Sequence, residues 1–214
     1  MAAAPEKLAK LRHLLAERFP SAPRTTGRTL PTGLPAIDDA TGGLPLGAVT
    51  EFVCATPSCG SQLLLGELLA ATRAQRVRTA LVDAADSFDP SSFPPDLLVH
   101  LVWVRCTAAT ALPAADLLAR DANLGLVILD LRRHAEAELR RTPSTTWYRL
   151  QRAVEPADLA LLVLTPRPSV PSAQLRFVLN TSHPAASLTA ERPALAAALS
   201  PTLQRQRLHL ALAG

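Results

Sequence analysis

Short apolar runs that alternate with helical stretches constrain the fold of this chain more than any other feature of its sequence. The runs, most of them apolar on both faces, are residues 48–54, 78–84, 98–106, 124–131 and 158–166. Helical stretches follow at residues 62–75, 112–123 and 146–156. Strands that are apolar on both faces and connected through helices are typical of a parallel sheet covered on two sides. The sequence therefore predicts an α/β fold with a mostly parallel sheet flanked by helices.

The C-terminal part of the chain has a different pattern. Residues 173–180 and 203–212 alternate apolar and polar side chains, and residues 191–200 have the pattern of a short helix. Alternation with a period of two is typical of strands with one exposed face. We therefore expect these two strands to extend the sheet in the antiparallel direction.

The N-terminal residues 5–19 have the pattern of an amphipathic helix. The apolar side chains on one face are Leu8, Leu11, Leu14, Leu15 and Phe19. A Pro/Thr/Gly-rich connection follows at residues 20–35. We expect residues 1–24 to form an N-terminal helix and linker, and residues 25–214 a single core domain. The apolar face is a candidate contact with the core, with a protein partner or with a second copy of the chain.

Composition excludes several classes of protein. No apolar run reaches the roughly 18–20 residues that a membrane-spanning helix needs, and the N-terminus lacks the continuous apolar segment of a secretion signal. We expect a cytoplasmic protein with no membrane contact. Cys54, Cys59 and Cys106 have neither metal-ligand spacing nor a disulfide framework. We therefore expect no metal site, and reduced thiols without a redox role.

Positive charge is concentrated in one segment. The net charge is +4, and residues 132–152 account for all of it, because they hold six arginines and two glutamates. The arginines are Arg132, Arg133, Arg140, Arg141, Arg149 and Arg152. Such a segment is a candidate contact with nucleic-acid phosphates or with an acidic protein surface. The alternative is a solvated helix face with Glu–Arg pairs. Trp147 and Tyr148 lie nearby, either as stacking platforms or as core residues.

The stretch CATPSCGSQLL, residues 54–64, joins a predicted strand to a predicted helix. Its spacing follows the phosphate-binding template G-x-x-x-x-G-K-[ST], with Ala55, Gly60, Ser61 and Gln62 at the four defined positions. Gly60 permits close approach of the backbone to a phosphate. Ser61 replaces the lysine and Gln62 replaces the magnesium-binding hydroxyl, and the chain has no lysine after Lys10. The sequence therefore predicts a degenerate nucleotide loop without a bound ATP–magnesium cofactor, in a protein that is not an enzyme.

Three segments resemble RecA proteins. Residues 32–52, TGLPAIDDATGGLPLGAVTEF, resemble the RecA motif that leads into the nucleotide-binding strand. Residues 80–90 resemble the strand and loop that bear the RecA catalytic glutamate, with Ala85 in its place, and residues 124–131 resemble the Walker B strand, with Asp130 at the magnesium-side acid. The resemblance implies a RecA-like fold of the P-loop NTPase type that has lost its reaction. As an alternative, Asp130 is only a turn residue at the end of a strand.

Within this group the sequence is most similar to ImuA-type accessory proteins of bacterial translesion synthesis, some of which are called SulA-like. The similar phrases are GGLPLGAVTEF (42–52), YRLQRAVE (148–155) and RPSVPSAQLRFVL (167–179). The resemblance implies an adaptor in DNA-damage tolerance, within the SOS mutagenesis response. Such an adaptor binds a Y-family-like polymerase subunit and an error-prone replicative-type polymerase.

Other functions remain open from the sequence alone. The connections at 132–145 and 166–173 are shorter than the DNA-binding loops of RecA proteins, which disfavours strand exchange. A weak contact with DNA through the arginine-rich segment is compatible with the adaptor role. The alternatives are a RecA-paralogue ATPase or DNA-binding recombination protein that uses an arginine in place of the lysine, and an inhibitor of cell division, which only the SulA-like name suggests.

Overall fold

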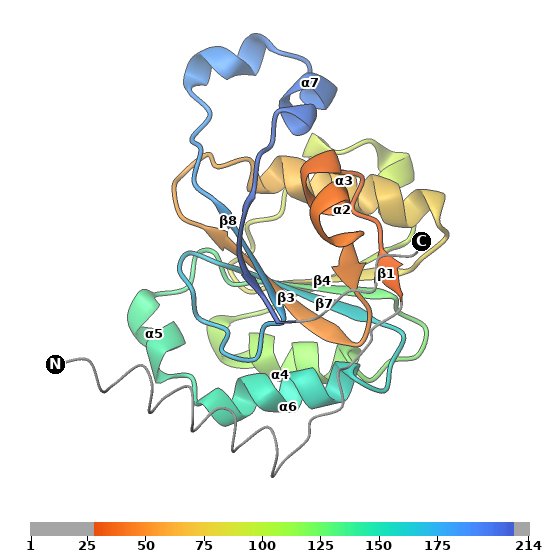
Figure 1. The fold of residues 1–214 in the computed structure, drawn as a ribbon, viewed down its shortest axis with the longest axis vertical. Helices are drawn as coiled ribbons and strands as arrows, with labels where there is room; N and C mark the ends of the chain where they lie inside the picture. Colours follow the sequence, from red (N-terminus) through yellow and green to blue (C-terminus); the bar gives the residue numbers. More distant parts are fainter. Residues whose placement is uncertain (1–27, 208–214) are drawn as a thin grey trace, which may run out of the picture.

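The computed structural model describes residues 28–207. Its centre is a seven-stranded sheet with the strand order β5-β4-β6-β7-β3-β8-β9 (Figure 1). The strands are β3 (Ala48–Cys54), β4 (Thr79–Asp83), β5 (Leu101–Arg105), β6 (Leu126–Asp130), β7 (Ala160–Thr165), β8 (Leu175–Leu179) and β9 (Thr202–Gln206). Strands β3 to β8 pair in parallel, and β9 alone runs antiparallel, against β8. The α/β fold with a mostly parallel sheet is confirmed.

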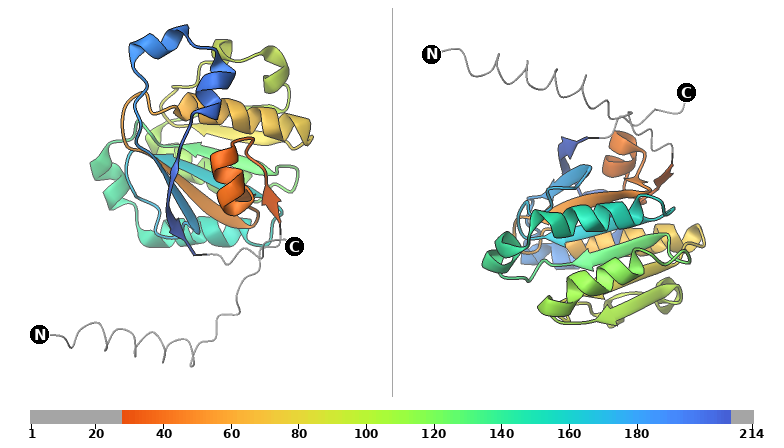
Figure 2. Two further views of the ribbon diagram at one scale, coloured as in Figure 1. Left: turned by 45° about the horizontal axis from the view of Figure 1, so that its top comes forward. Right: turned by 90° about the horizontal axis from the view of Figure 1, so that it is seen from below.

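Helices cover both faces of this sheet (Figures 1 and 2). Helices α2 (Pro35–Thr41) and α3 (Ser61–Ala74) lie on one face, and α4 (Ala108–Leu118) and α6 (Ser144–Val154) lie on the other. The shorter helices are α5 (Glu136–Arg141) and α7 (Arg192–Ala197), with 3-10 turns η1 (Pro90–Ser92), η2 (Pro95–Leu98) and η3 (Ala185–Thr189). A small antiparallel pair, β1 (Thr29–Leu30) and β2 (Leu44–Pro45), precedes the sheet.

The core consists of two apolar layers, one on each face of the sheet. Alternate residues of a strand enter different layers: Leu162 packs with the leucines of α3, whereas Leu161 and Val163 pack with α4 and α6. All three are fully buried. Burial of such a side chain stabilises the fold by about 1.5–3 kcal/mol. The double-sided burial explains why these strands are apolar at every position.

The structure corrects the prediction for residues 173–180. We expect a half-exposed antiparallel strand there, but β8 is almost fully buried and runs parallel to β3. Arg176 supplied the polar position in the pattern, and it lies directly opposite Glu51 in the register of β3 and β8. The two side chains form a buried ion pair, so the polar position faces a partner and not solvent. The predicted antiparallel direction is confirmed only for β9, which lies at the edge.

Other boundaries shift by a few residues. Helix α4 begins at Ala108, before the predicted start at 112, because Thr107 and Thr110 form a capping box and Pro113 is accommodated inside the helix. The predicted strand at 98–106 shortens to β5, since η2 extends to Leu98 and a turn follows at residues 99–100. The predicted N-terminal helix with Leu8, Leu11 and Leu15 lies outside the described residues. Between residues 28 and 207, no helix has the length and apolar character to cross a membrane.

Candidate functional site

The loop between β3 and α3 lies at the edge of the sheet where the parallel strands end. Cys54 is the last residue of β3, and Gly60 is the residue before α3. Gly60 has a φ of +83°, and a Cβ atom there would lie 2.4 Å from Leu199 Cδ2 and 3.2 Å from His183 Nε2. The position therefore needs glycine both for its backbone conformation and for space.

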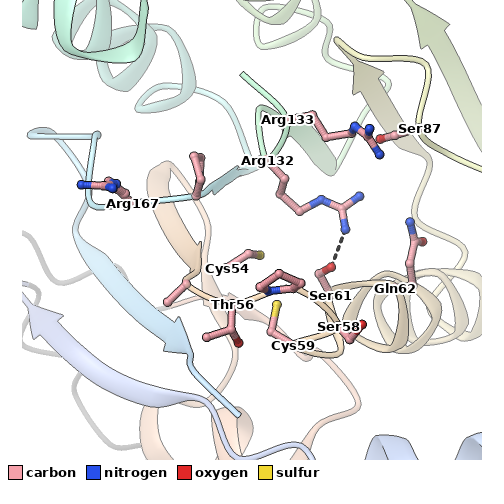
Figure 3. A pocket seen from close by; sticks show the side chains of 13 residues that line it. Cys54, Thr56, Ser58, Cys59, Ser61, Gln62, Ser87, Arg132, Arg133 and Arg167 are labelled. Carbon is pink, nitrogen blue, oxygen red and sulfur yellow. Dashed lines mark hydrogen bonds between the residues drawn. The ribbon is translucent and has the colours of Figure 1, made fainter. Parts of the chain in front are cut away.

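A cavity of about 490 Å³ opens over this loop (Figure 3). Residues 54–59 form its floor together with Ser61 and Gln62 from the start of α3. The connections that follow the neighbouring strands supply the rest of the lining, namely Ser87 after β4, Arg132 and Arg133 after β6, and Pro166 and Arg167 after β7. The carboxyl ends of four strands thus contribute to one site, as expected for a parallel sheet.

Arg132 connects two of the residues predicted for the degenerate nucleotide loop. Its Nε donates to Asp130 Oδ1 at 2.9 Å, its Nη2 donates to Asp130 Oδ2 at 2.5 Å, and its Nη1 donates to Ser61 Oγ. Burial alone would lower the pKa of Arg132, but the hydrogen bond and negative charge of Asp130 outweigh it and raise the pKa. The guanidinium is therefore a permanent cation, held on the acid at the end of β6 and on the serine at the lysine position of the template.

Two thiols lie at the two ends of the same loop. Cys59 accepts hydrogen bonds from the Cys54 thiol and from the backbone and side chain of Ser61, and together with the charge of Arg132 these outweigh burial and lower its pKa to about 6. The pKa of Cys54 is raised, first by its hydrogen bond to Cys59, then by burial and by the charge of Cys59. In this pair the surroundings favour the thiolate form on Cys59 and the protonated form on Cys54.

Ala85, at the predicted position of the catalytic glutamate, does not line the cavity. It lies in the exposed turn after β4, where the buried carboxylate is Asp83. Asp83 accepts backbone hydrogen bonds from Ala85, Ser87 and Phe88, and one from Trp103 Nε1. Burial would raise the pKa of Asp83, but these hydrogen bonds outweigh it and lower the pKa. All of its donors belong to the turn and to β5, so Asp83 holds the turn and is not presented to the cavity as a base.

A second buried carboxylate, Glu51, holds the connection that follows β7. Its Oε1 accepts hydrogen bonds from Thr165 Oγ1 at 2.9 Å, Ser169 N at 2.7 Å and Val170 N at 3.2 Å. Its Oε2 accepts from Arg176 Nε at 2.6 Å, and Arg176 also donates to Val170 O. Glu51 thereby fixes the connection after β7 that carries Arg167 into the cavity lining.

The six arginines predicted as contacts do not form one surface. Arg132 and Arg133 line the main cavity, whereas Arg140 lines a second cavity of about 380 Å³ with Arg176 and Arg205. Arg140 pairs with Glu136 at 2.8 Å, and Arg149 pairs with Asp116 at 3.4 Å. Arg141 and Arg152 are exposed and line neither of these cavities. The interpretation as a helix face with ion pairs thus holds for Arg140 and Arg149, and contact of the segment with a phosphate or a protein stays a prediction.

The aromatic pair in this segment is divided in the same way. Trp147 is only 1% exposed and packs in the core, whereas Tyr148 is 47% exposed. The core interpretation therefore holds for Trp147 alone. Tyr148 remains available on the outer face of α6.

Sequence reasoning missed several residues of the site. Ser87 and Arg167 belong to it because they follow β4 and β7, whose carboxyl ends meet the loop. The sequence signal for both residues was their place directly after a predicted parallel strand, because the carboxyl ends of such strands gather at one edge of the sheet. Cys54 and Cys59 were expected to have no role, and nothing in their spacing shows that they share a cavity.

Comparisons with known proteins give no relative: no family model and no curated protein matches the sequence. Among residues 28–207, no group of histidine, cysteine or acidic side chains has an arrangement that would hold a metal ion. The interpretation of the site therefore rests on its geometry and on the resemblance of the sequence motifs.

Proposed function

We propose that this chain is a catalytically silent RecA-like protein that acts as an adaptor in DNA-damage tolerance. The observation that carries the proposal is the position of the Arg132 guanidinium, which bridges Asp130 and Ser61. These are the positions at which a hydrolysing P-loop protein has its magnesium-side acid and its lysine. An internal ion pair occupies the place of the catalytic groups.

The charges of the loop argue against triphosphate chemistry. A bound triphosphate needs cations that are free to meet its phosphates, and a magnesium ion held by an acid and a hydroxyl. Arg132 is already paired with Asp130, and their side chains are only 13% and 3% exposed. Removing one partner of such a buried pair typically costs about 3–5 kcal/mol. Gln62 offers no hydroxyl and Ala85 no base, so we propose neither a nucleotide cofactor nor an enzymatic activity.

The RecA-like part of the proposal is supported by the arrangement of the loop. Phosphate-binding sites commonly consist of an inner strand of a parallel sheet, a turn and the start of a helix. Here β3, a turn with the left-handed Gly60 and α3 follow one another in this way. Asp130 stands at the end of β6 with only β7 between β6 and the loop strand β3. This arrangement is consistent with a RecA-like fold that has been retained without nucleotide hydrolysis.

The adaptor part of the proposal is supported by the resemblance to ImuA-type proteins and by the side chains that α6 exposes to solvent. In the similar phrase at 148–155, Leu150, Gln151 and Val154 are buried, whereas Tyr148 and Arg152 face outward. An exposed aromatic residue beside arginines is typical of protein contact surfaces. We propose this face of α6 as a contact with a Y-family-like polymerase subunit or an error-prone replicative-type polymerase.

Two measurements test the proposal. Calorimetry of the full chain with magnesium and ATP should show neither binding nor turnover. A pull-down at low salt with the Y-family-like subunit and the polymerase of the same organism should show association. The double variant Tyr148→Ala/Arg152→Ala should weaken that association, whereas the control Val102→Ala, at the exposed edge of the sheet, should not. Absence of association of the unaltered chain with either protein contradicts the adaptor role.

A second candidate is nucleotide hydrolysis with an arginine in place of the lysine. The hydrogen bond from Arg132 to Ser61 favours it, because it brings a cation to the lysine position of the loop. In this case magnesium-dependent ATP binding should be tight and should be lost in Asp130→Ala and in Arg132→Ala. Such a result would replace the proposal of a silent site.

A weak contact with DNA is also favoured by a specific observation. Arg205 and Arg207 both donate to Pro171 O, and neither forms an ion pair with a carboxylate in residues 28–207. Burial lowers the pKa of Arg205, and the charges of Arg176 and Arg207 lower it further. This excess of positive charge beside the 380 Å³ cavity is suited to a phosphate backbone.

The salt dependence of binding to single-stranded DNA tests this contact. Each phosphate contact contributes about −0.7 to the slope of log affinity against log salt. Arg205→Gln/Arg207→Gln should therefore make the slope shallower by about 1.4 if both arginines contact phosphates. Arg120→Gln, in the connection after α4, a helix that packs on β4 and β6, is the matched control. An unchanged slope in the double variant excludes the contact.

A further inference from the structure

The loop between β3 and α3 has a cysteine at each end, and both line the 490 Å³ cavity. We propose that Cys59 and Cys54 form a reversible thiol-modification site for peroxides, in which Cys59 attacks and Cys54 resolves the product as an intramolecular disulfide. This inference is independent of the proposed adaptor function.

The position of the two side chains is the first argument. Cys54 ends β3, Cys59 precedes Gly60, and the turn between them brings the two thiols within hydrogen-bonding reach of each other. In Figure 3 the Cys59 side chain points from the loop toward the end of β3, where Cys54 lies. Ser58, between them, has a φ of +55°, so the turn is tight. Cys59 is only 3% exposed and packs at the border of the core, and Cys54 is half-buried. Both residues line the cavity, so a small oxidant reaches the thiols from that side.

The surroundings of Cys59 are the second argument. Ser61 donates to its sulfur through both the backbone N–H and the hydroxyl, and the Arg132 guanidinium contributes a positive charge. Arg133 and Arg167 also line the cavity, and the nearby Asp130 is paired with Arg132. His183 lies beside Gly60 on the other side of the loop. The arginines outnumber the acids, and a helix N-terminus with adjacent cations is the environment in which thiolates are stabilised.

Cys106 provides an internal comparison. It follows β5, far along the sheet from the loop, and its Sγ approaches Asp83 O at 3.7 Å. Burial raises the pKa of Cys106, and the hydrogen bond with Thr110 only partly opposes this. Cys106 is not among the residues that line the main cavity. The same chain thus contains one thiol, Cys59, whose neighbours favour the thiolate, and a less buried thiol, Cys106, whose surroundings oppose it.

The chemistry balances with a peroxide as the oxidant. The Cys59 thiolate attacks hydrogen peroxide and forms a sulfenic acid, with hydroxide as the leaving group. The Cys54 thiol then attacks the sulfenic sulfur, and the new disulfide forms with loss of water. Overall two thiols are oxidised by one peroxide, which is reduced to two waters. A thiol reductant reverses the step.

The modification changes the charge of the cavity. In the reduced state the Cys59 thiolate offsets part of the positive charge of Arg132, whereas a disulfide carries no charge. Oxidation therefore makes the cavity more positive by one unit and ties the end of β3 to the start of α3. The site thus links the redox state of the chain to the electrostatics of the loop.

The test uses the full chain with equimolar hydrogen peroxide, followed by alkylation, digestion and mass spectrometry. We expect a mass decrease equal to two hydrogen atoms, located in a peptide in which Cys54 and Cys59 are linked, and its reversal by dithiothreitol. Cys54→Ser should stop at the sulfenic acid of Cys59, which dimedone traps. Cys106→Ser should leave the disulfide yield unchanged.

Alkylation rates against pH supply a second measurement on the unaltered protein. At pH 6 about half of Cys59 is thiolate, whereas only about 0.3% of an ordinary thiol of pKa ~8.5 is ionised. A thiolate of lower pKa is also a weaker nucleophile, so we expect Cys59 to be alkylated roughly tenfold faster than an ordinary thiol at this pH. The Cys59 rate should level off above pH ~7, whereas the Cys106 rate should continue to rise. A Cys59 midpoint above pH 8, or the absence of a linked 54–59 peptide after peroxide treatment, overturns the proposal.

Discussion

The buried ion pair between Glu51 and Arg176 gives the sharpest prediction about stability. Glu51 is fully buried and Arg176 is 9% exposed, and the pair joins the central strand β3 to β8. The substitution Arg176→Met preserves most of the volume of the side chain but removes its charge. Glu51 then keeps its three hydrogen bonds to Thr165 and to the connection after β7 but loses its cation.

The expected cost follows from the burial of the remaining charge. Removal of one partner of a buried ion pair typically costs about 3–5 kcal/mol, because the other charge stays in a medium of low polarity. In a protein of this size a loss of 1 kcal/mol lowers the melting temperature by roughly 2–4 °C, so we expect a decrease of roughly 6–20 °C. Urea unfolding at neutral pH, followed by circular dichroism, measures the free energy directly.

Two variants separate the ion pair from other effects. Glu51→Gln/Arg176→Met removes both charges and should be less destabilised than Arg176→Met alone, because no uncompensated charge remains. Arg73→Met breaks an exposed pair with Asp96, in which the Arg73 and Asp96 side chains are 41% and 70% exposed, and should cost much less than Arg176→Met because solvent screens the pair. If Arg176→Met costs no more than Arg73→Met, the buried pair does not have the importance assigned to it here.

Three further substitutions have definite outcomes. Gly60→Ala should lower the free energy of unfolding by about 1–3 kcal/mol, because alanine is strained at a φ of +83° and its Cβ would lie 2.4 Å from Leu199 Cδ2. Urea unfolding measures this loss, and an unchanged free energy would show that the loop adjusts without strain. Leu162→Ala, at the centre of the sheet, should cost about 2–5 kcal/mol in the same assay, and a cost below about 1 kcal/mol would contradict the close packing of β7. The lowered pKa of Asp83 means that its ionised form stabilises the fold above pH ~4, and that this contribution is lost as the pH falls through the folded-state pKa. Asp83→Asn should therefore be destabilised at pH 7 and approach the unaltered protein near pH 2, and an equal difference at both pH values would refute the assignment.

The strand prediction was most successful where burial is symmetric. Residues 48–54 coincide with β3, and the apolar runs at 124–131 and 158–166 contain β6 and β7. These strands are apolar on both faces because helices cover both faces, so the local pattern reports the tertiary environment directly. The prediction failed at β8, where Arg176 suggested a solvent-facing position. Its partner Glu51 is 125 residues away in the sequence.

The loop shows a similar division. The template correctly placed Gly60 in the turn before the helix, because a strand, a turn and a helix are consecutive in the chain, and the helix begins at Ser61, one residue before the predicted start at 62. The template gave no sign that Arg132 reaches Ser61, from which it is separated by 71 residues. Ala85 was aligned with a catalytic position, yet the turn after β4 is organised by the buried Asp83 instead.

The sequence by itself determined the alternation of the central strands with helices, the mostly parallel character of the sheet and the absence of a lysine from the loop, because these depend on composition and on periodicity over neighbouring residues. Only the tertiary structure decided that Arg132 pairs with Asp130 and Ser61, that Glu51 is neutralised by Arg176, and that Cys54 and Cys59 share a cavity. Charged and nucleophilic side chains acquire their properties from partners, burial and solvent access. Those conditions exist only once distant segments have been brought together at the edge of the sheet.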